Sequence, residues 1–162
     1  MRQTANVTLL NAGIDVATMA GRGLATTDRA AFNVFLPKDV SAAELGQAVK
    51  AALSASRDFY GHEPEMTVLL DNAPDAHKAW QAELVKKTGA RGKKSLFCPA
   101  KSLTIRNMGD GLKLSPSHQE TMNGFGPAKT GYSEELIAMP ESDEAFGELI
   151  RDALGYCTSK FD

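Results

Sequence analysis

Side chains that could act together in catalysis lie close together at one place in this sequence, the segment Ser115-Pro-Ser-His-Gln-Glu120. Ser115 and Ser117 are candidate nucleophiles, His118 is a candidate general base, and Glu120 could orient the imidazole. Neither serine has the flanking glycines of a nucleophile elbow. We therefore expect a structural role, in which Ser117 caps a turn and His118 makes a fixed hydrogen bond. The alternative is a small α+β hydrolase that uses His118 with Ser115 or Ser117.

Two further motifs have the residue types of a binding site but not its spacing. His62-Glu-Pro-Glu65 offers metal ligands, yet no second histidine follows at metal-binding spacing and Pro64 argues against a helix, so we expect a solvated loop. Gly124-Phe-Gly-Pro127 has the glycines of a phosphate-binding loop, but no strand precedes it and Pro127 has no amide to donate. We expect no catalytic residues, no metal site and no cofactor.

The length and composition are those of one ordinary globular domain. The chain has 162 residues, of which 43% are hydrophobic and 23% charged, and we treat residues 1–162 as a single domain. No apolar run approaches the roughly 20 residues that a membrane span requires, so no membrane association is expected. Cys98 and Cys157 show no disulfide pattern, and the apolar stretch at 7–10 is too short for a signal peptide. We expect a cytoplasmic protein.

Apolar periodicity and capping residues predict three helices. Ser41 and Glu44 form a capping-box pattern, and apolar residues at helical spacing follow to about residue 56. A second helix is expected from Asn72, with Pro74 in its first turn, to Gly89, and a final helix from Ser142 to about residue 155. Residues 66–70 fit either a strand or a helical turn. Strands are expected at residues 7–10, 31–36, 95–98, 102–106, 112–115 and 134–139.

These elements predict an α+β fold, a largely antiparallel or mixed β-sheet with about three helices. Turn residues at 107–111 form a hairpin whose second strand ends at Pro116. Apolar residues of the last helix stand 101 residues after those of the first, and Gly46 and Gly147 have the same helical phase. Because glycine inside a helix costs about 1 kcal/mol relative to alanine, we expect a packing reason at both positions. Either the two helices are unrelated, or they belong to a quasi-repeated strand–proline–helix unit whose glycines let each helix lie close to a sheet.

Charge is unevenly distributed, although the net charge is only −2. Five basic residues and no acid lie between Lys86 and Lys94, without the interleaved aromatic residues that stack nucleic-acid bases. An RNA-associated housekeeping module using this run is an alternative, but we expect no tight nucleic-acid binding. The C-terminal region is acidic, which fits either a solvated face or a docking surface for a basic partner.

Three stretches resemble, in order, segments of the immunity proteins of bacterial contact-dependent growth inhibition (CDI) systems, the CdiI family. The most specific is Leu36-Pro-Lys-Asp-Val-Ser-Ala-Ala-Glu-Leu-Gly-Gln-Ala-Val-Lys-Ala-Ala-Leu-Ser-Ala-Ser-Arg57. The others are Lys93-Lys-Ser-Leu-Phe97 and Leu114-Ser-Pro-Ser-His-Gln-Glu120. The resemblance extends from about Gly21 to Tyr156, and residues 58–75 depart from the pattern.

The resemblance implies a non-enzymatic protein that binds the C-terminal toxin domain of a cognate CdiA effector and blocks it inside the bacterial cell. Such toxins are frequently nucleases, and an RNase is the first expectation here. It also implies that the gene directly follows a very long adhesin-like gene. Nucleases are usually basic because their substrate is a polyanion, so carboxylates of the inhibitor are expected at the contact.

Two groups of acids are candidates for that contact. The leading group lies toward the C-terminus and consists of Glu134, Glu135, Glu141, Asp143 and Glu144. The competing group lies in the segment that departs from the family pattern and consists of Glu63, Glu65, Asp71 and Asp75.

Overall fold

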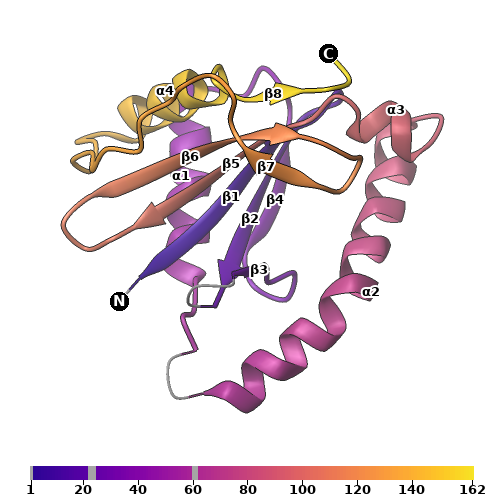
Figure 1. Cartoon of the computed structure of the whole chain (residues 1–162), viewed down its shortest axis with the longest axis horizontal. Helices are drawn as coiled ribbons and strands as arrows, with labels where there is room; N and C mark the ends of the chain where they lie inside the picture. Colours follow the sequence, from indigo (N-terminus) through magenta and orange to yellow (C-terminus); the bar gives the residue numbers. More distant parts are fainter. Residues whose placement is uncertain (1, 22–24, 60–61) are drawn as a thin grey trace.

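The computed structural model of the chain describes residues 2–21, 25–59 and 62–162 (Figure 1). These residues form four helices and eight strands, which confirms the expected α+β class. The helices are α1 (Ala42–Ala55), α2 (Glu63–Thr88), α3 (Lys93–Phe97) and α4 (Asp143–Leu154). The strands are β1 (Gln3–Leu9), β2 (Ile14–Ala20), β3 (Thr26–Thr27), β4 (Asn33–Leu36), β5 (Lys101–Asn107), β6 (Leu112–Gln119), β7 (Phe125–Pro127) and β8 (Thr158–Ser159). No helix in the described ranges is long and apolar enough to cross a membrane.

The sheet is built around β1, which lies between β2 and β5. The strand order is β3-β2-β1-β5-β6-β7, and β4 also pairs with β2, beside the shorter β3. All these pairs are antiparallel, whereas β8 joins β6 in parallel. The expected hairpin between β5 and β6 is confirmed, with the Met108 amide donating to the Gly111 carbonyl at 2.8 Å. β2 was not among the strands predicted from the sequence.

The two faces of the sheet differ because side chains alternate along each strand. On β1, Ala5 and Val7 belong to the main core, while Asn6 and Thr8 point to the opposite face. The main core is completed by apolar residues of α1 and α4, including Leu45 and Phe146, so these two helices cover one face. A smaller core at the end of β1 and β5 joins α2 and α3, and its buried members are Leu10, Leu84, Leu96, Phe97 and Ala100.

α1 and α4 pack directly against each other through the two glycines identified in the sequence. A Cβ atom added to Gly46 would lie well inside 3.0 Å of the Asp143 backbone, and one added to Gly147 would lie equally close to Ala42. The contacts are reciprocal, because Asp143 begins α4 and Ala42 begins α1. The expected packing reason is therefore confirmed. The close approach, however, joins the two helices to each other rather than a helix to the sheet.

The proposed strand–proline–helix repeat is not present in the described residues, because no strand precedes α4 in the way that β4 precedes α1. Residues 134–139 form no strand and make only an isolated bridge between Ile137 and Leu112. Ile137 packs against the main core, whereas Leu136 and Met139 are exposed. With one residue of the segment facing the core, the segment cannot bury the alternating face that supports a strand.

The longest helix differs most from the prediction. α2 begins at Glu63 rather than at Asn72, and it includes residues 66–70 and an interior proline, Pro74. The proline in the first turn is Pro64, where a missing amide costs no hydrogen bond. Pro74 is exposed, so water can solvate the carbonyl that loses its partner. The segment from His62 is therefore the start of a helix and not a loop.

Two smaller predictions were also wrong. Residues 95–98 were expected as a strand, but residues 93–97 form α3, whose first turn is closed by hydrogen bonds of the Ser95 hydroxyl with the backbone of Gly92. β6 does not end at Pro116 but continues to Gln119. Pairing with β5 ends at Pro116 and pairing with β7 begins at Ser117, so the proline stands where the strand changes partners.

Candidate functional site

The segment that could have carried catalysis forms part of β6, and its side chains have structural partners. Arg106 donates a hydrogen bond to Ser115 Oγ at 2.8 Å, and Ser117 Oγ donates to the Ser102 carbonyl at 2.6 Å. His118 Nδ1 lies 2.7 Å from Thr158 Oγ1 on β8. The expected hydrogen bond of His118 is confirmed, whereas Ser117 lies within a strand instead of capping a turn. These contacts join β6 to β5 and β8.

The motifs at residues 62–65 and 124–127 also belong to regular elements of the fold, as the start of α2 and as part of β7. In the part of the chain that the structure describes, no three histidine, cysteine or acidic side chains are grouped so that they could hold a metal ion. Glu63 and Glu65 lie in the first turn of α2, where carboxylates interact favourably with the helix dipole. Gly126 and Pro127 belong to β7, which pairs with β6 and leads into no helix.

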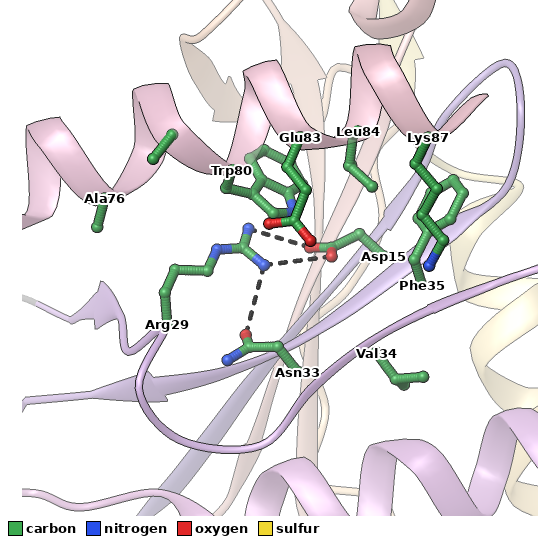
Figure 2. Close-up of a pocket in the computed structure, with 11 residues that line it drawn as sticks. Asp15, Arg29, Asn33, Val34, Phe35, Ala76, Trp80, Glu83, Leu84 and Lys87 are labelled. Atoms are coloured by element: carbon green, nitrogen blue, oxygen red, sulfur yellow. Dashed lines mark hydrogen bonds and ion pairs between the residues drawn. The ribbon is translucent and has the colours of Figure 1, made fainter. Parts of the chain in front are cut away.

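An ion pair beneath α2 holds this helix against the sheet (Figure 2). Arg29, in the loop between β3 and β4, reaches both carboxylate oxygens of Asp15 on β2 at 3.2 Å. Its guanidinium lies 3.9 Å from the centre of the Trp80 ring on α2, and it donates a longer hydrogen bond, 3.4 Å, to Asn33 Oδ1. One arginine thus connects the sheet, a loop and the helix. We call Asp15, Arg29 and Trp80 the α2 latch.

Asp15 is the energetically unfavourable member of the latch, because its carboxylate is a charged group whose side chain is only 4% exposed. Burial raises the pKa of Asp15, and the charge and hydrogen bonds of Arg29, together with a hydrogen bond from Trp80, oppose that rise. The cavity beside the latch has a volume of about 400 Å³ and is also lined by Glu83 and Lys87. This cluster was not predicted from the sequence, since no strand was expected at residues 14–20. The apolar neighbours of Asp15, Ile14 and Val16, were the available signal.

The face of the sheet opposite α1 and α4 is polar. The hydroxyls of Ser102 and Thr104 donate to Asn6 Oδ1 at 3.2 and 3.3 Å, and the Asn6 amide donates to Thr8 at 2.9 Å. Cavities of about 230 and 350 Å³ open over this face, between α2 and the strands in one case and beside β7 in the other. The polar side chains satisfy one another, so this face needs no apolar layer to cover it.

The leading acids lie on the segment that leads into α4 and in the first turn of α4. Glu134, Glu135, Glu141 and Glu144 are exposed, and we call these four residues the C-terminal edge. Asp143 differs from them, because Lys50 of α1 donates to its carboxylate at 2.5 Å and thereby lowers the pKa of Asp143. That carboxylate already has a cationic partner within the chain. Two apolar side chains of the same segment, Leu136 and Met139, are 48% and 40% exposed.

The competing acids all lie in the first half of α2, residues 63–75, which we call the acidic half of α2. Glu63, Glu65, Asp71 and Asp75 are exposed there, and the segment contains no lysine or arginine. Glu65 has one weak ion pair, at 3.8 Å to Arg57, and both side chains are largely exposed. The basic run, Lys86 to Lys94, begins in the last turn of the same helix and continues into α3. The sequence separated these charges correctly, but it did not reveal that one helix carries both.

The chain as a whole matches a known family. The family model described as CDI immunity protein covers residues 3–157. The chain belongs to the CDI immunity protein family. A curated relative is Immunity protein CdiI-YPIII from Yersinia pseudotuberculosis serotype O:3 (strain YPIII), which is 30% identical over 133 residues, 74% of this chain and 75% of that protein. The resemblance inferred from the three sequence stretches is therefore confirmed.

Solved structures of two proteins share this CDI immunity protein's fold. One is a protein of unknown function from Neisseria meningitidis, with a TM-score of 0.88, 23% identity and coverage of 97% of this chain and 96% of that one. The other is a chain from a CdiA-CT/CdiI toxin and immunity complex from Yersinia pseudotuberculosis, with a TM-score of 0.83, 24% identity and coverage of 97% and 98%. At these identities the likeness establishes the fold.

Proposed function

We propose that this chain binds and neutralises the C-terminal toxin domain of a cognate CdiA effector. The observation that carries the proposal is the family match over residues 3–157, nearly the whole chain. The Yersinia relative is named an immunity protein, and a chain of the same fold comes from a toxin and immunity complex. Both support a toxin domain as the partner.

The finer part of the proposal concerns the toxin and the mode of action. The toxin is a nuclease, with an RNase as the first candidate, and the inhibitor acts in the cytoplasm by covering the toxin without catalysing a reaction. The hydroxyl and imidazole groups of β6 support a role without catalysis, because they bond to strand partners instead of forming a nucleophile–base pair. Neutralisation at cellular concentrations requires a Kd near the nanomolar range, about −12 kcal/mol. An interface of roughly 1,600 Å² with a few buried anchors is the usual way to reach it.

Charge reversal of the two acidic surfaces tests where the toxin binds. One variant changes the C-terminal edge to lysine, and the other changes Glu63, Asp71 and Asp75. We expect the variant at the contact to associate roughly tenfold more slowly at low salt and to lose most of its salt dependence, because acids near a basic partner steer the encounter. The measurement is the association rate with the purified toxin domain at two salt concentrations.

The matched control reverses Asp39 and Asp110, which are exposed acids outside both surfaces. This control is expected to change the association rate less than about twofold. If reversing neither acidic surface affects the association rate, the contact is not acidic, and the expectation that carboxylates of the inhibitor contact a basic nuclease is wrong. If wild-type protein does not bind the toxin domain at all, the proposed function itself is wrong.

A further inference from the structure

α2 extends well beyond the part of the protein that supports it. Its 26 residues make a helix about 39 Å long at a rise of about 1.5 Å per residue. Gln81 and Leu84 are buried, and Trp80 and Val85 pack in the smaller core, so the C-terminal half is anchored. The acidic half, residues 63–75, contains no buried side chain. Figure 1 shows this half extending past β3 and away from the sheet.

One stripe of mainly apolar side chains runs along α2, but the chain covers only part of it. The stripe residues follow one another at alternating spacings of four and three, which places them on one face of the helix. They are Met66, Leu70, Ala73, His77, Trp80 and Leu84. Trp80 and Leu84 pack in the smaller core, whereas Met66 and Leu70 belong to neither core, and Leu70 is 36% exposed. The stripe therefore continues past the surface that it packs against.

Charge identifies what could cover the exposed part of the stripe. Glu63 and Glu65 lie on either side of the start of the stripe, whereas Asp71 and Asp75 lie toward the opposite face of the helix, and no lysine or arginine of that half balances the four acids. A partner that buries the stripe must therefore place its rim against carboxylates, and a basic rim is complementary. Helices that dock into grooves use anchors at spacings such as i, i+4 and i+7, which Met66, Leu70 and Ala73 provide.

We propose that the acidic half of α2 docks into an apolar groove of the toxin domain, with Met66 and Leu70 as anchors and basic toxin residues facing Glu63 and Glu65 at the rim. This inference rests on the proposed function, which supplies a basic, nucleic-acid-degrading protein as the occupant. The α2 latch fits this role, because it fixes the anchored half of the helix and so holds the docking half in a defined direction. Nucleic acid is a poor occupant, since its phosphates would approach a helix segment that carries four carboxylates and no lysine or arginine.

The test replaces both anchors by glutamine, which has a helix propensity close to that of methionine and leucine. Met66→Gln with Leu70→Gln is expected to weaken binding of the toxin domain at least tenfold, mostly through faster dissociation, because buried anchors act on dissociation. The matched control is Val68→Gln on the same helix. Val68 is 60% exposed and lies off the stripe, so its replacement is expected to change the Kd less than about twofold. Thermal melting of all three proteins verifies folding.

The outcomes separate this inference from the proposed function. If wild-type protein binds the toxin domain and the anchor variant binds equally well, the docking surface is wrong while the function stands. If the wild type does not bind, the function fails. If sedimentation shows that the chain alone is a dimer and that the anchor variant is a monomer, a second copy covers the stripe, and the toxin is the wrong occupant.

Discussion

Replacing Gly147 by alanine is expected to destabilise the protein by about 3 kcal/mol or more, or to prevent folding. The added methyl group would overlap the backbone at Ala42, which begins α1 and cannot rotate away as a side chain can. Overpacking of a core costs roughly 1–3 kcal/mol when side chains can adjust, and here the neighbour is backbone. For a chain of this length, a loss of about 3 kcal/mol corresponds to a fall in Tm of roughly 10 °C. Thermal melting followed by circular dichroism measures it.

Gly92→Ala is the matched control for this substitution. A Cβ atom added at Gly92 would meet nothing within 4 Å, and the extended backbone there accepts any residue. This variant should melt within about 2 °C of the wild type. Gly46→Ala should behave like Gly147→Ala, because its Cβ would overlap Asp143 in the reciprocal contact. A Gly147→Ala protein that melts like the wild type would contradict the close helix contact.

Arg29→Gln is expected to reduce the free energy of unfolding by about 3 kcal/mol at neutral pH, because it leaves Asp15 buried without its cation. Burial already raises the pKa of Asp15, and loss of Arg29 would raise it further. A carboxyl whose folded pKa is raised contributes stability at low pH and loses it as the pH rises through that pKa. The deficit of the variant should therefore be largest at neutral pH and shrink as the pH falls.

Urea unfolding of wild type and variant at several values of pH between 4 and 8 measures this difference. The control is the double variant Arg29→Gln with Asp15→Asn, which removes both charges while keeping similar shapes. It should recover most of the lost stability, and its deficit relative to wild type should not grow as the pH rises. A deficit in Arg29→Gln that stays constant across this pH range would show that Asp15 is not responsible.

Local signals predicted the two helices of the main core well. The capping box of Ser41 and Glu44 and the cap at Ser142 both exist as expected, with hydrogen bonds from the Glu44 and Ala145 amides. Each cap joins residues only three positions apart, so the local sequence is sufficient to predict where these helices begin. The glycine pattern predicted a close contact, but it could not identify the partner, because that partner lies about 100 residues away in the sequence.

The candidate site was harder to predict because it depends on contacts between distant segments. Asp15 can be recognised as part of a cluster only once Arg29 and Trp80 are known to lie beside it, and these two residues belong to a loop and a helix elsewhere in the chain. The competing acids were expected in an irregular segment because Pro64 indicates a break and Pro74 indicates the first turn of a later helix, yet both prolines lie within α2. Since α2 is continuous, its acids, apolar stripe and basic end become parts of one element. Spacing along the sequence does not show which part of that stripe stays uncovered.

Coproduction with the toxin tests the central claim most directly. The C-terminal domain of the cognate CdiA effector, whose gene is expected directly upstream of this chain's gene, is expressed from an inducible promoter in cells that do or do not produce this protein. We expect growth to stop without the protein and to continue at the uninduced rate with it, and we expect the two proteins to purify as a complex. Growth arrest in cells that contain the folded, soluble protein together with this toxin domain would contradict the account.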